Sequence, residues 1–299
     1  MIIKKQHNLK KLGFSLIELS VVILIIGILV IGISKGKTII SKTRIVSGMS
    51  LTKSSPVHSI PDIIAWYEPV LDSSFNTTQT LNNNPISNIN GSAWFDNSTA
   101  ANNGSVGGTV RYVSSAINNI PALSFASSGY IAFNCAALNQ KYATIFVVEQ
   151  RNAAIANQFL ETDISGYNPN AWGYIWADNV GAFRLGCCQL NSPVVVPAFN
   201  ANNRIPRIYT FLSSPSTSVS QGSFVNGGDG NGGTSGTSSG TPGVQMKTNS
   251  TCYIGGSSLL YTGNIAEVII FSRALSLSER NAVQQYLGKK YSIKVATST

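Results

Sequence analysis

Histidine is almost absent from this chain, because only His7 and His58 occur among its 299 residues. The first lies in a basic leader, and the second lies in a predicted linker ahead of the strand-rich part. We therefore exclude a Ser-His-Asp or Cys-His catalytic site in that part, and also a histidine-based zinc site. The sequence predicts a protein that is not an enzyme.

Charged residues are also scarce, at 11% of the chain. The formal net charge of +9 is local: residues 1–53 contain nine basic residues and one acid, whereas residues 54–299 contain 12 basic and 11 acidic residues. Basic residues beside an apolar segment are typical of membrane-flanking sequence. Since no basic stripe or nucleic-acid-binding motif follows, we expect no nucleic-acid partner.

Carboxylates at catalytic spacing are missing as well. Glycosidases need paired carboxylates, and the nearest match, Glu161-Thr162-Asp163, has no third acid after it. Glu267 shares a predicted strand face with Ile265, Ile269 and Phe271, so we interpret it as a paired structural carboxylate. Calcium is conceivable because four aspartates occur in Asn-rich stretches, but no calcium-loop spacing is present, and turn chemistry is favoured, with no cofactor and no metal site. These aspartates are Asp96, Asp163, Asp178 and Asp229.

The chain has only four cysteines. An even number in an exported chain favours disulfides, and four cysteines allow three pairings. The adjacent Cys187 and Cys188 would face opposite sides of a strand, so two separate bridges fit better than a vicinal one. Buried free thiols are the alternative. The disulfide candidates are Cys135, Cys187, Cys188 and Cys252.

One long apolar run, residues 14–33, stands out, and Glu18 is its only charged residue. About 20 helical residues span roughly 30 Å, the hydrocarbon thickness of a bilayer. The small residue Gly13 precedes the run, whereas an ordinary secretory signal is cleaved after a shorter one. The helical pattern continues beyond the run until Ser54-Ser55-Pro56 ends it. We therefore predict a leader over residues 1–13, a transmembrane assembly helix over 14–53 and a head domain over 54–299.

This amino-terminal pattern resembles the prepilin signals of type IV pilins and type II secretion pseudopilins. The resemblance implies that a prepilin peptidase cuts between Gly13 and Phe14, and that Phe14 becomes an N-methylated amino terminus. It also implies that Glu18 helps assembly with other pilin subunits, and the new amine of a neighbouring subunit is its natural partner. No proline interrupts the helix before Pro56, unlike in many major pilins, so major pilin, minor pilin and pseudopilin all stay open. The matching residues are Lys10-Lys11-Leu12-Gly13-Phe14-Ser15-Leu16-Ile17-Glu18-Leu19.

The head reads as many short strands with one late helix. Strong strand patterns cover residues 143–149, 207–212 and 265–271, and Ser276-Leu277-Ser278-Glu279 is a capping box. The sequence therefore predicts a mainly β jelly-roll sandwich. Several segments resemble the concanavalin A-like, laminin G-like family, which implies a fold and a tendency to bind carbohydrate or protein rather than a definite ligand. These segments are residues 94–98, 120–125, 224–227 and 261–276.

The stretch from Tyr167 to Asp178 alternates aromatic and amide residues, which suits sugar stacking and hydrogen bonding. We take Tyr167, Trp172, Trp176 and Asp178 as ligand candidates. Core packing is nevertheless favoured for this stretch, since Trp172, Tyr174 and Trp176 would share one strand face.

Together these features predict a type IV pilin-like subunit, a minor pilin, with a lectin-like head in a structural or adhesive role. It would sit in the inner membrane as a single-pass protein before assembly, and then in a pilus, outside the cell or in the periplasm. A surface glycan or protein is its expected ligand. The alternatives are a type II secretion pseudopilin, and a membrane-anchored carbohydrate-binding module that does not assemble.

Overall fold

The computed structural model describes most of the chain, with its placed residues in sixteen segments. They are residues 15–76, 79–80, 82–126, 128–138, 142–152, 157–162, 171–172, 174–177, 183–186, 194–196, 204–215, 221–230, 233–238, 245–246, 251–256 and 261–296. The chain divides into two compact units, Met1–Thr43 and Arg44–Thr299. The described part of the first unit is helical, and it belongs to α1 (Leu16–Lys53).

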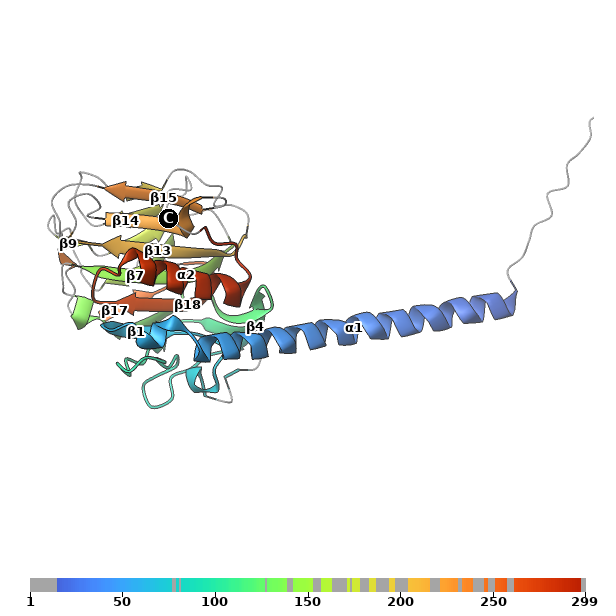
Figure 1. The fold of residues 1–299 in the computed structure, drawn as a ribbon. Coiled ribbons are helices and arrows are strands. Elements are labelled where there is room, and N and C mark those ends of the chain that lie inside the picture. The colour runs from blue at the N-terminus through green and yellow to red at the C-terminus, as the bar shows by residue number, and fades with distance from the viewer. Residues whose placement is uncertain are drawn as a thin grey trace, which may run out of the picture. The chain divides into compact units, whose positions relative to one another are not determined.

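The second unit, which we call the head, is a sandwich of two antiparallel sheets (Figure 1). The nine-stranded sheet has the order β15-β14-β13-β7-β18-β5-β4-β2, and β1 pairs with β18 beside β5. Its strands are β1 (Ile63–Tyr67), β2 (Asn84–Pro85), β4 (Val110–Ile117), β5 (Ile120–Phe125), β7 (Ala143–Arg151), β13 (Arg207–Ser213), β14 (Gln221–Gly230), β15 (Gly233–Ser238) and β18 (Gly263–Phe271).

The second large sheet has seven strands in the order β12-β11-β10-β8-β17-β6-β3. A small parallel pair joins β9 (Ala171–Trp172) to β16 (Gln245–Met246). The prediction of a long amino-terminal helix followed by a β-sandwich is confirmed. The strands of the second sheet are β3 (Ser105–Gly107), β6 (Tyr130–Asn134), β8 (Asn157–Thr162), β10 (Tyr174–Ala177), β11 (Phe183–Gly186), β12 (Val194–Val196) and β17 (Thr251–Ile254).

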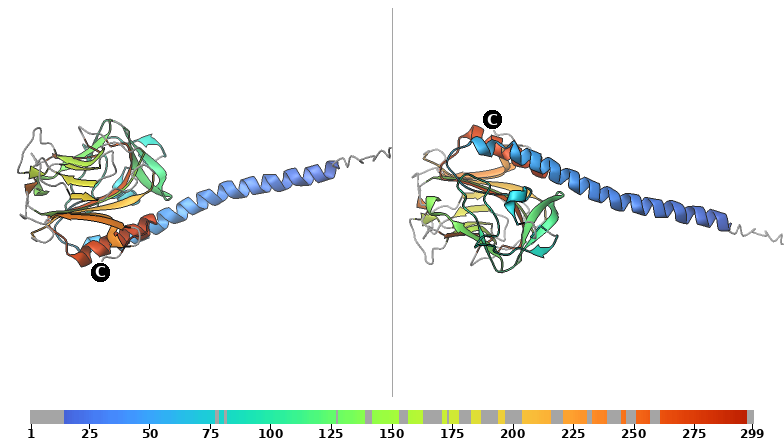
Figure 2. Two further views of the ribbon diagram at one scale, coloured as in Figure 1. Left: turned by 90° about the horizontal axis from the view of Figure 1, so that it is seen from above. Right: turned by 90° about the horizontal axis from the view of Figure 1, so that it is seen from below.

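Two hydrophobic cores lie on the two faces of the nine-stranded sheet. One fills the space between the sheets and includes Leu123, Val147 and Ile254. The other lies under α2 (Leu277–Tyr291), which covers the outer face of the nine-stranded sheet (Figure 2). Alternating side chains of β7 supply both cores, because successive residues of a strand point to opposite faces.

Helix α2 begins at the predicted capping box. The hydroxyl of Ser276 accepts the Glu279 amide at 3.3 Å, and the Glu279 carboxylate accepts the Ser276 amide at 2.8 Å. The two bonds satisfy backbone donors that the first turn of a helix leaves without partners. Ser292 ends α2 in a left-handed conformation, with φ of 51°.

The last turns of α1 belong to the head. Arg44 donates to the hydroxyl of Ser292 at 2.6 Å and to the carbonyl of Lys290 at 3.3 Å, which caps the end of α2. Gly48 is buried against Ile120, and a Cβ there would lie 3.2 Å from that side chain. A small residue at position 48 therefore lets the helix approach the sheet closely.

The side chains of Asn88 and Asn226 form hydrogen bonds with the backbone of strands. The Asn88 amide both donates to the Val106 carbonyl and accepts the Val106 amide, which covers the outer edge of β3. The Asn226 side chain accepts the Ile208 amide at 2.9 Å between the neighbouring strands β14 and β13. The Asn88 contact instead pairs backbone groups that an open strand edge would leave free.

Candidate functional site

Glu18 lies in the first turn of α1, where it caps its own helix. Its carboxylate accepts the Ser15 amide at 2.8 Å, and the Ser15 hydroxyl accepts the Ile17 amide at 3.2 Å. A negative charge is favourable at this end of a helix. Gly13 and Phe14, the predicted cleavage and methylation residues, lie outside the described residues.

The first turns of α1 expose apolar side chains on every side. The large apolar residues from Leu16 to Ile33 are between 46% and 87% exposed. A helix that is apolar all round needs an apolar surrounding, either lipid or other helices. This surface is therefore suited to bundling with similar helices.

Within the part of the chain that the structure describes, no helix has both the length and the apolarity to cross a membrane. The predicted span over residues 14–33 stays a prediction.

Glu267 is a structural carboxylate at the centre of a buried network. It accepts hydrogen bonds from Trp66 (2.7 Å), Tyr286 (2.8 Å), Lys290 (2.7 Å) and Tyr291 (2.9 Å). Burial, and then the charge of Glu267, raises the pKa of both tyrosines well above its ordinary value, so their hydroxyls stay protonated and donate. Both carboxylate oxygens therefore accept two hydrogen bonds each.

A β-bulge corrects the predicted strand face of Glu267. The register of β18 against β7 shifts between Ile265 and Glu267. Glu267 therefore faces α2 together with Ile269 and Phe271, whereas Ile265 faces the core between the sheets. The prediction assumed unbroken alternation, which an inserted residue breaks.

Sequence reasoning missed the two partners that complete this network. Lys290 also donates to Glu68 at 2.9 Å, and the side chains of Glu68 and Lys290 are fully buried. Glu68 accepts the amides of Val70 and Leu71 as well. The two carboxylates thus share one lysine, and the surrounding backbone amides, hydroxyls and the Trp66 indole supply their other hydrogen bonds.

A different buried carboxylate, Glu149, lies in the core between the sheets. Glu149 accepts Arg151 at 3.2 Å and the hydroxyl of Tyr261. Burial, and then the charge of Glu149, raises the pKa of Tyr261 well above its ordinary value. An arginine and a protonated phenol therefore both donate to the Glu149 carboxylate.

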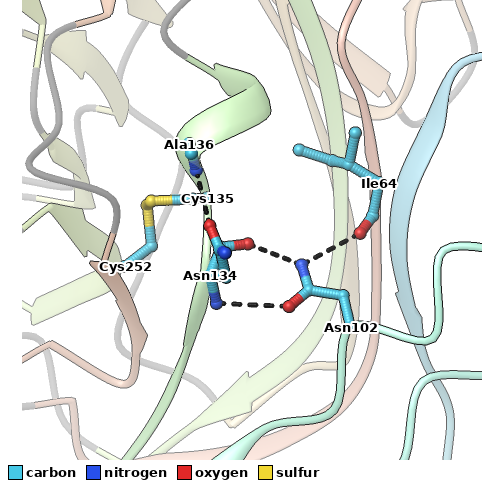
Figure 3. Close-up of a disulfide and its surroundings, with 6 residues drawn as sticks. All are labelled: Ile64, Asn102, Asn134, Cys135, Ala136 and Cys252. Atoms are coloured by element: carbon cyan, nitrogen blue, oxygen red, sulfur yellow. Dashed lines mark hydrogen bonds between the residues drawn. A yellow bond between two sulfur atoms is a disulfide. The ribbon is translucent and has the colours of Figure 1, made fainter.

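Cys135 and Cys252 form a disulfide between the end of β6 and β17 (Figure 3). Beside it, the Asn102 side chain pairs with the backbone of Asn134 in both directions and also donates to the Ile64 carbonyl at 3.0 Å. The loop before β3 is thereby tied to a strand of each sheet. The prediction of a disulfide bond is confirmed for this pair, and Cys187 and Cys188 lie outside the described residues.

Asp96 organises the loop between β1 and β3. Its carboxylate accepts the amides of Trp66 (2.7 Å), Ser98 (2.9 Å) and Asn102 (2.8 Å), as well as the Ser98 hydroxyl. This is the turn chemistry that the sequence favours over calcium binding. Among the described residues, no group of three or more His, Cys, Asp or Glu side chains is placed to hold a metal ion.

The other acids named from the sequence lie either in strands or outside the described residues. Glu161 lies in β8 and is buried. Asp229 lies in β14, and Asp163 and Asp178 lie outside the described residues.

The predicted aromatic and amide stretch does not form one strand. Trp172 ends β9, which pairs with β16, whereas Tyr174 and Trp176 belong to β10 in the seven-stranded sheet. The expectation that Trp172, Tyr174 and Trp176 share one strand face is therefore wrong. Tyr167 lies outside the described residues.

His58 is part of the head rather than of a free linker, which corrects the prediction. It lies in the short 3-10 helix η1 (Pro56–Ser59), and its ring meets Trp66 edge-on at 4.8 Å between centroids. Its Nε2 lies 3.2 Å from the Thr52 carbonyl. The sequence places Pro56 correctly as the end of α1, but the chain stays packed on the sheet afterwards.

The capping residue Glu279 gives a pH prediction. The pKa of Glu279 is lowered to about 2, mainly because its carboxylate accepts hydrogen bonds from Arg273. Because this value lies below the unfolded value of about 4.3, the stabilisation is complete above that pH and is lost as the pH falls toward 2. The side chains of Arg273 and Glu279 are each 28% exposed, so solvent screens the pair and its contribution is small.

We therefore expect the melting temperature of Glu279→Gln to fall less steeply than that of the natural chain between pH 4.5 and 2, with the two profiles parallel above pH 5. Thermal melts at a series of pH values measure this. Parallel profiles throughout would contradict the assignment.

One family model matches the amino-terminal segment of the chain. Residues 8–34 match the prokaryotic N-terminal methylation motif. This motif implies processing by a prepilin peptidase, export, inner-membrane anchoring and assembly with pilins. The chain thus joins a type IV pilin-like amino-terminal motif to a β-sandwich head. No curated protein matches the sequence.

Solved structures resemble the head at low identity. Domain 4 of AbnA, an extracellular arabinanase of Geobacillus stearothermophilus in complex with arabinotriose, is 12% identical with a TM-score of 0.45, over 75% of this chain and 98% of that one. The receptor-binding domain of a botulinum neurotoxin C/D mosaic serotype is 14% identical with a TM-score of 0.47, over 76% and 51%. Trypanosoma rangeli sialidase in complex with sialic acid is 13% identical with a TM-score of 0.49, over 79% and 34%. The chain thus spans about half of the second protein and a third of the third, and at these values the likeness carries no conclusion about ligand or activity.

Proposed function

We propose that this chain is a minor subunit of a type IV pilus, with an exported head that makes adhesive contacts. The observation that carries the proposal is the methylation motif over residues 8–34, which runs into a helix with apolar side chains exposed all round. Such a helix is stable only in lipid or among other helices. Lipid would surround this helix before assembly, and the helices of other subunits would surround it in the fibre.

The size of the head favours a minor component over the main shaft subunit. The compact unit from Arg44 to Thr299 is much larger than the helix that anchors it. The Cys135–Cys252 disulfide suits an exported domain, because disulfides persist in oxidising compartments.

We propose that the head binds rather than catalyses. Three of the buried carboxylates, Glu68, Glu149 and Glu267, accept hydrogen bonds from donors that the fold holds in place. A general acid or base needs a proton that it can exchange with a substrate. Groups held in this way stabilise the fold instead.

The test is the location and abundance of the protein in purified fibres. Immunogold labelling should show sparse label on fibres, and a strain without prepilin peptidase should show none. Label along every shaft would indicate a major pilin. Label confined to the cell envelope, together with a secretion defect in a deletion strain, would indicate a pseudopilin. Processed protein that never enters a fibre would indicate an anchored binding module.

A further inference from the structure

Three parts of the head meet where α1 joins it: the first head residues of α1, the turn between β4 and β5, and the end of α2. Arg44 donates to the carbonyl of Asn118 at 3.5 Å and to the hydroxyl of Ser292 at 2.6 Å. Asn118 in turn donates to the carbonyl of the last residue of α2 at 2.7 Å. We call the surface formed by Arg44, residues 118–119 and residues 289–294 the basic pole.

The exposed charges of the basic pole are all positive. Lys289 and Lys294 are exposed on either side of the residue that Arg44 binds. Lys290 lies between them in sequence but is fully buried against two carboxylates, so it adds no charge to the surface. None of the chain's 12 acidic residues lies in the segments that contain the pole, which are residues 34–61, 97–148 and 280–299.

Lys289 and Lys294 supply most of the charge that a partner would meet. Arg44 also donates to the Lys290 carbonyl at 3.3 Å, so its guanidinium is bound to the end of α2. A cation there offsets the partial negative charge of the last carbonyls of a helix. Neither exposed lysine forms an ion pair within the part of the chain that the structure describes. The pole therefore offers two ammonium groups to an anionic partner.

Helix α1 connects the basic pole to the segment that the methylation motif assigns to the membrane. The stretch of α1 from Ile33, the end of the predicted span, to Arg44 is about 16 Å long at 1.5 Å per residue. The headgroups of a bilayer extend roughly 5–7 Å beyond its hydrocarbon. The pole of an anchored chain therefore comes within about 10 Å of the headgroups, which is close to the Debye length at about 0.1 M salt.

We propose that the basic pole docks on anionic phospholipid headgroups while the chain is anchored in the membrane, before assembly. The inference rests on the proposed pilin-like function and adds to it a lipid contact of the head. The stretch between the span and the pole has the same character, because it contains Lys35, Lys37 and Lys42 and no acid. Each basic residue near an anionic membrane surface strengthens binding about fivefold.

The chemistry of the basic pole fits a lipid surface better than an acidic protein. A lysine ammonium is a compact, strongly hydrated point charge on a flexible stem, whereas arginine matches a carboxylate with a planar pair of donors. The arginine of the pole already donates to two backbone carbonyls and a hydroxyl. A layer of phosphate groups requires positive charge but no fixed geometry, and the two exposed lysines provide that.

The test uses the full chain in nanodiscs of phosphatidylcholine, with or without phosphatidylglycerol as the anionic lipid. An uncharged reagent acetylates exposed lysines, and mass spectrometry measures the rate at each one. We expect Lys289 and Lys294 to react about threefold or more slowly in the anionic discs, and this difference to vanish at about 1 M salt, where the Debye length is about 3 Å. Lys53 is exposed about 14 Å further along α1 than Arg44 and should react equally in both discs.

Replacing one lysine of the pole leaves the other as the reporter. Lys289→Gln should restore most of the labelling rate of Lys294 in anionic discs, and Lys294→Gln should do the same for Lys289, because each variant loses about fivefold in binding. The matched control Lys53→Gln removes an exposed lysine away from the pole. It should leave both lysines of the pole as slow to react as in the natural chain.

Three results would overturn lipid docking. The first is equal labelling of the pole in both discs, or no gain at the remaining lysine in either variant. The second is equal slowing at Lys53, which would show a general effect of a charged membrane. The third is protection in pure phosphatidylcholine that appears only in discs with two chains, which would assign the pole to a second copy. Immunogold labelling of fibres tests the proposed function separately in every case.

Discussion

Replacing Lys290 by alanine should destabilise the head by about 3–5 kcal/mol, the usual cost of removing one partner of a buried ion pair. The ammonium lies 2.7 Å from Glu267 and 2.9 Å from Glu68, and all three side chains have no exposure to solvent. Without it, two carboxylates would remain buried side by side with no cation between them. Chemical denaturation of the full chain in detergent, followed by tryptophan fluorescence, measures the loss.

Two further variants make this result specific. Lys289→Ala changes the neighbouring exposed lysine of α2 and should alter stability by less than about 0.5 kcal/mol. Adding Glu68→Gln to Lys290→Met should recover part of the loss, because one of the uncompensated charges is removed. Equal denaturation midpoints for Lys290→Ala and Lys289→Ala would refute the structural role of the network.

Replacing Glu18 by alanine should leave membrane insertion intact and should reduce incorporation into fibres about tenfold or more. A lone charge in an apolar segment costs about 3 kcal/mol, so insertion does not depend on it. Assembly depends on Glu18, because its carboxylate is the only negative charge in the helix that can pair with the methylated amine of a neighbouring subunit. Quantitative blotting of membrane and fibre fractions separates the two effects.

Glu18→Gln separates charge pairing from helix capping. The carboxylate accepts the Ser15 amide at 2.8 Å, and a glutamine oxygen keeps that bond while removing the charge. If charge pairing drives assembly, the glutamine variant fails as the alanine variant does. Normal fibres with Glu18→Gln would show that capping alone is the function of this residue.

The amino-terminal motif was predictable because it depends only on a short stretch of local sequence. Gly13, the apolar run over residues 14–33 and Glu18 within that run all lie in one continuous segment. The capping box at Ser276 and Glu279 was predictable for the same reason, since its two bonds join residues three apart.

The buried network was not predictable because its members meet only in the folded sheet. Glu68 and Lys290 are 222 residues apart in sequence. One indication was available: Lys290 follows Val283, Tyr286 and Leu287 at helical spacing, which places a lysine on the apolar face of α2. A lysine in that position requires a buried acid, but the sequence does not reveal which one.

The predictions that the structure corrects have similar physical causes. The bulge before Glu267 reverses the face of Ile265, and alternation alone does not predict an inserted residue. His58 looked like a linker residue because Pro56 ends α1, yet the chain after it packs against Trp66. The position of His58 thus depends on tertiary contacts that no local pattern encodes.

The most direct test of the central claim, that this is a processed pilin-like subunit, is amino-terminal mass spectrometry of the protein isolated from cells that carry prepilin peptidase. We expect the isolated chain to start at Phe14 and to bear a methyl group on its amine. An intact Met1, or cleavage after Ile33 as by an ordinary signal peptidase, would contradict it.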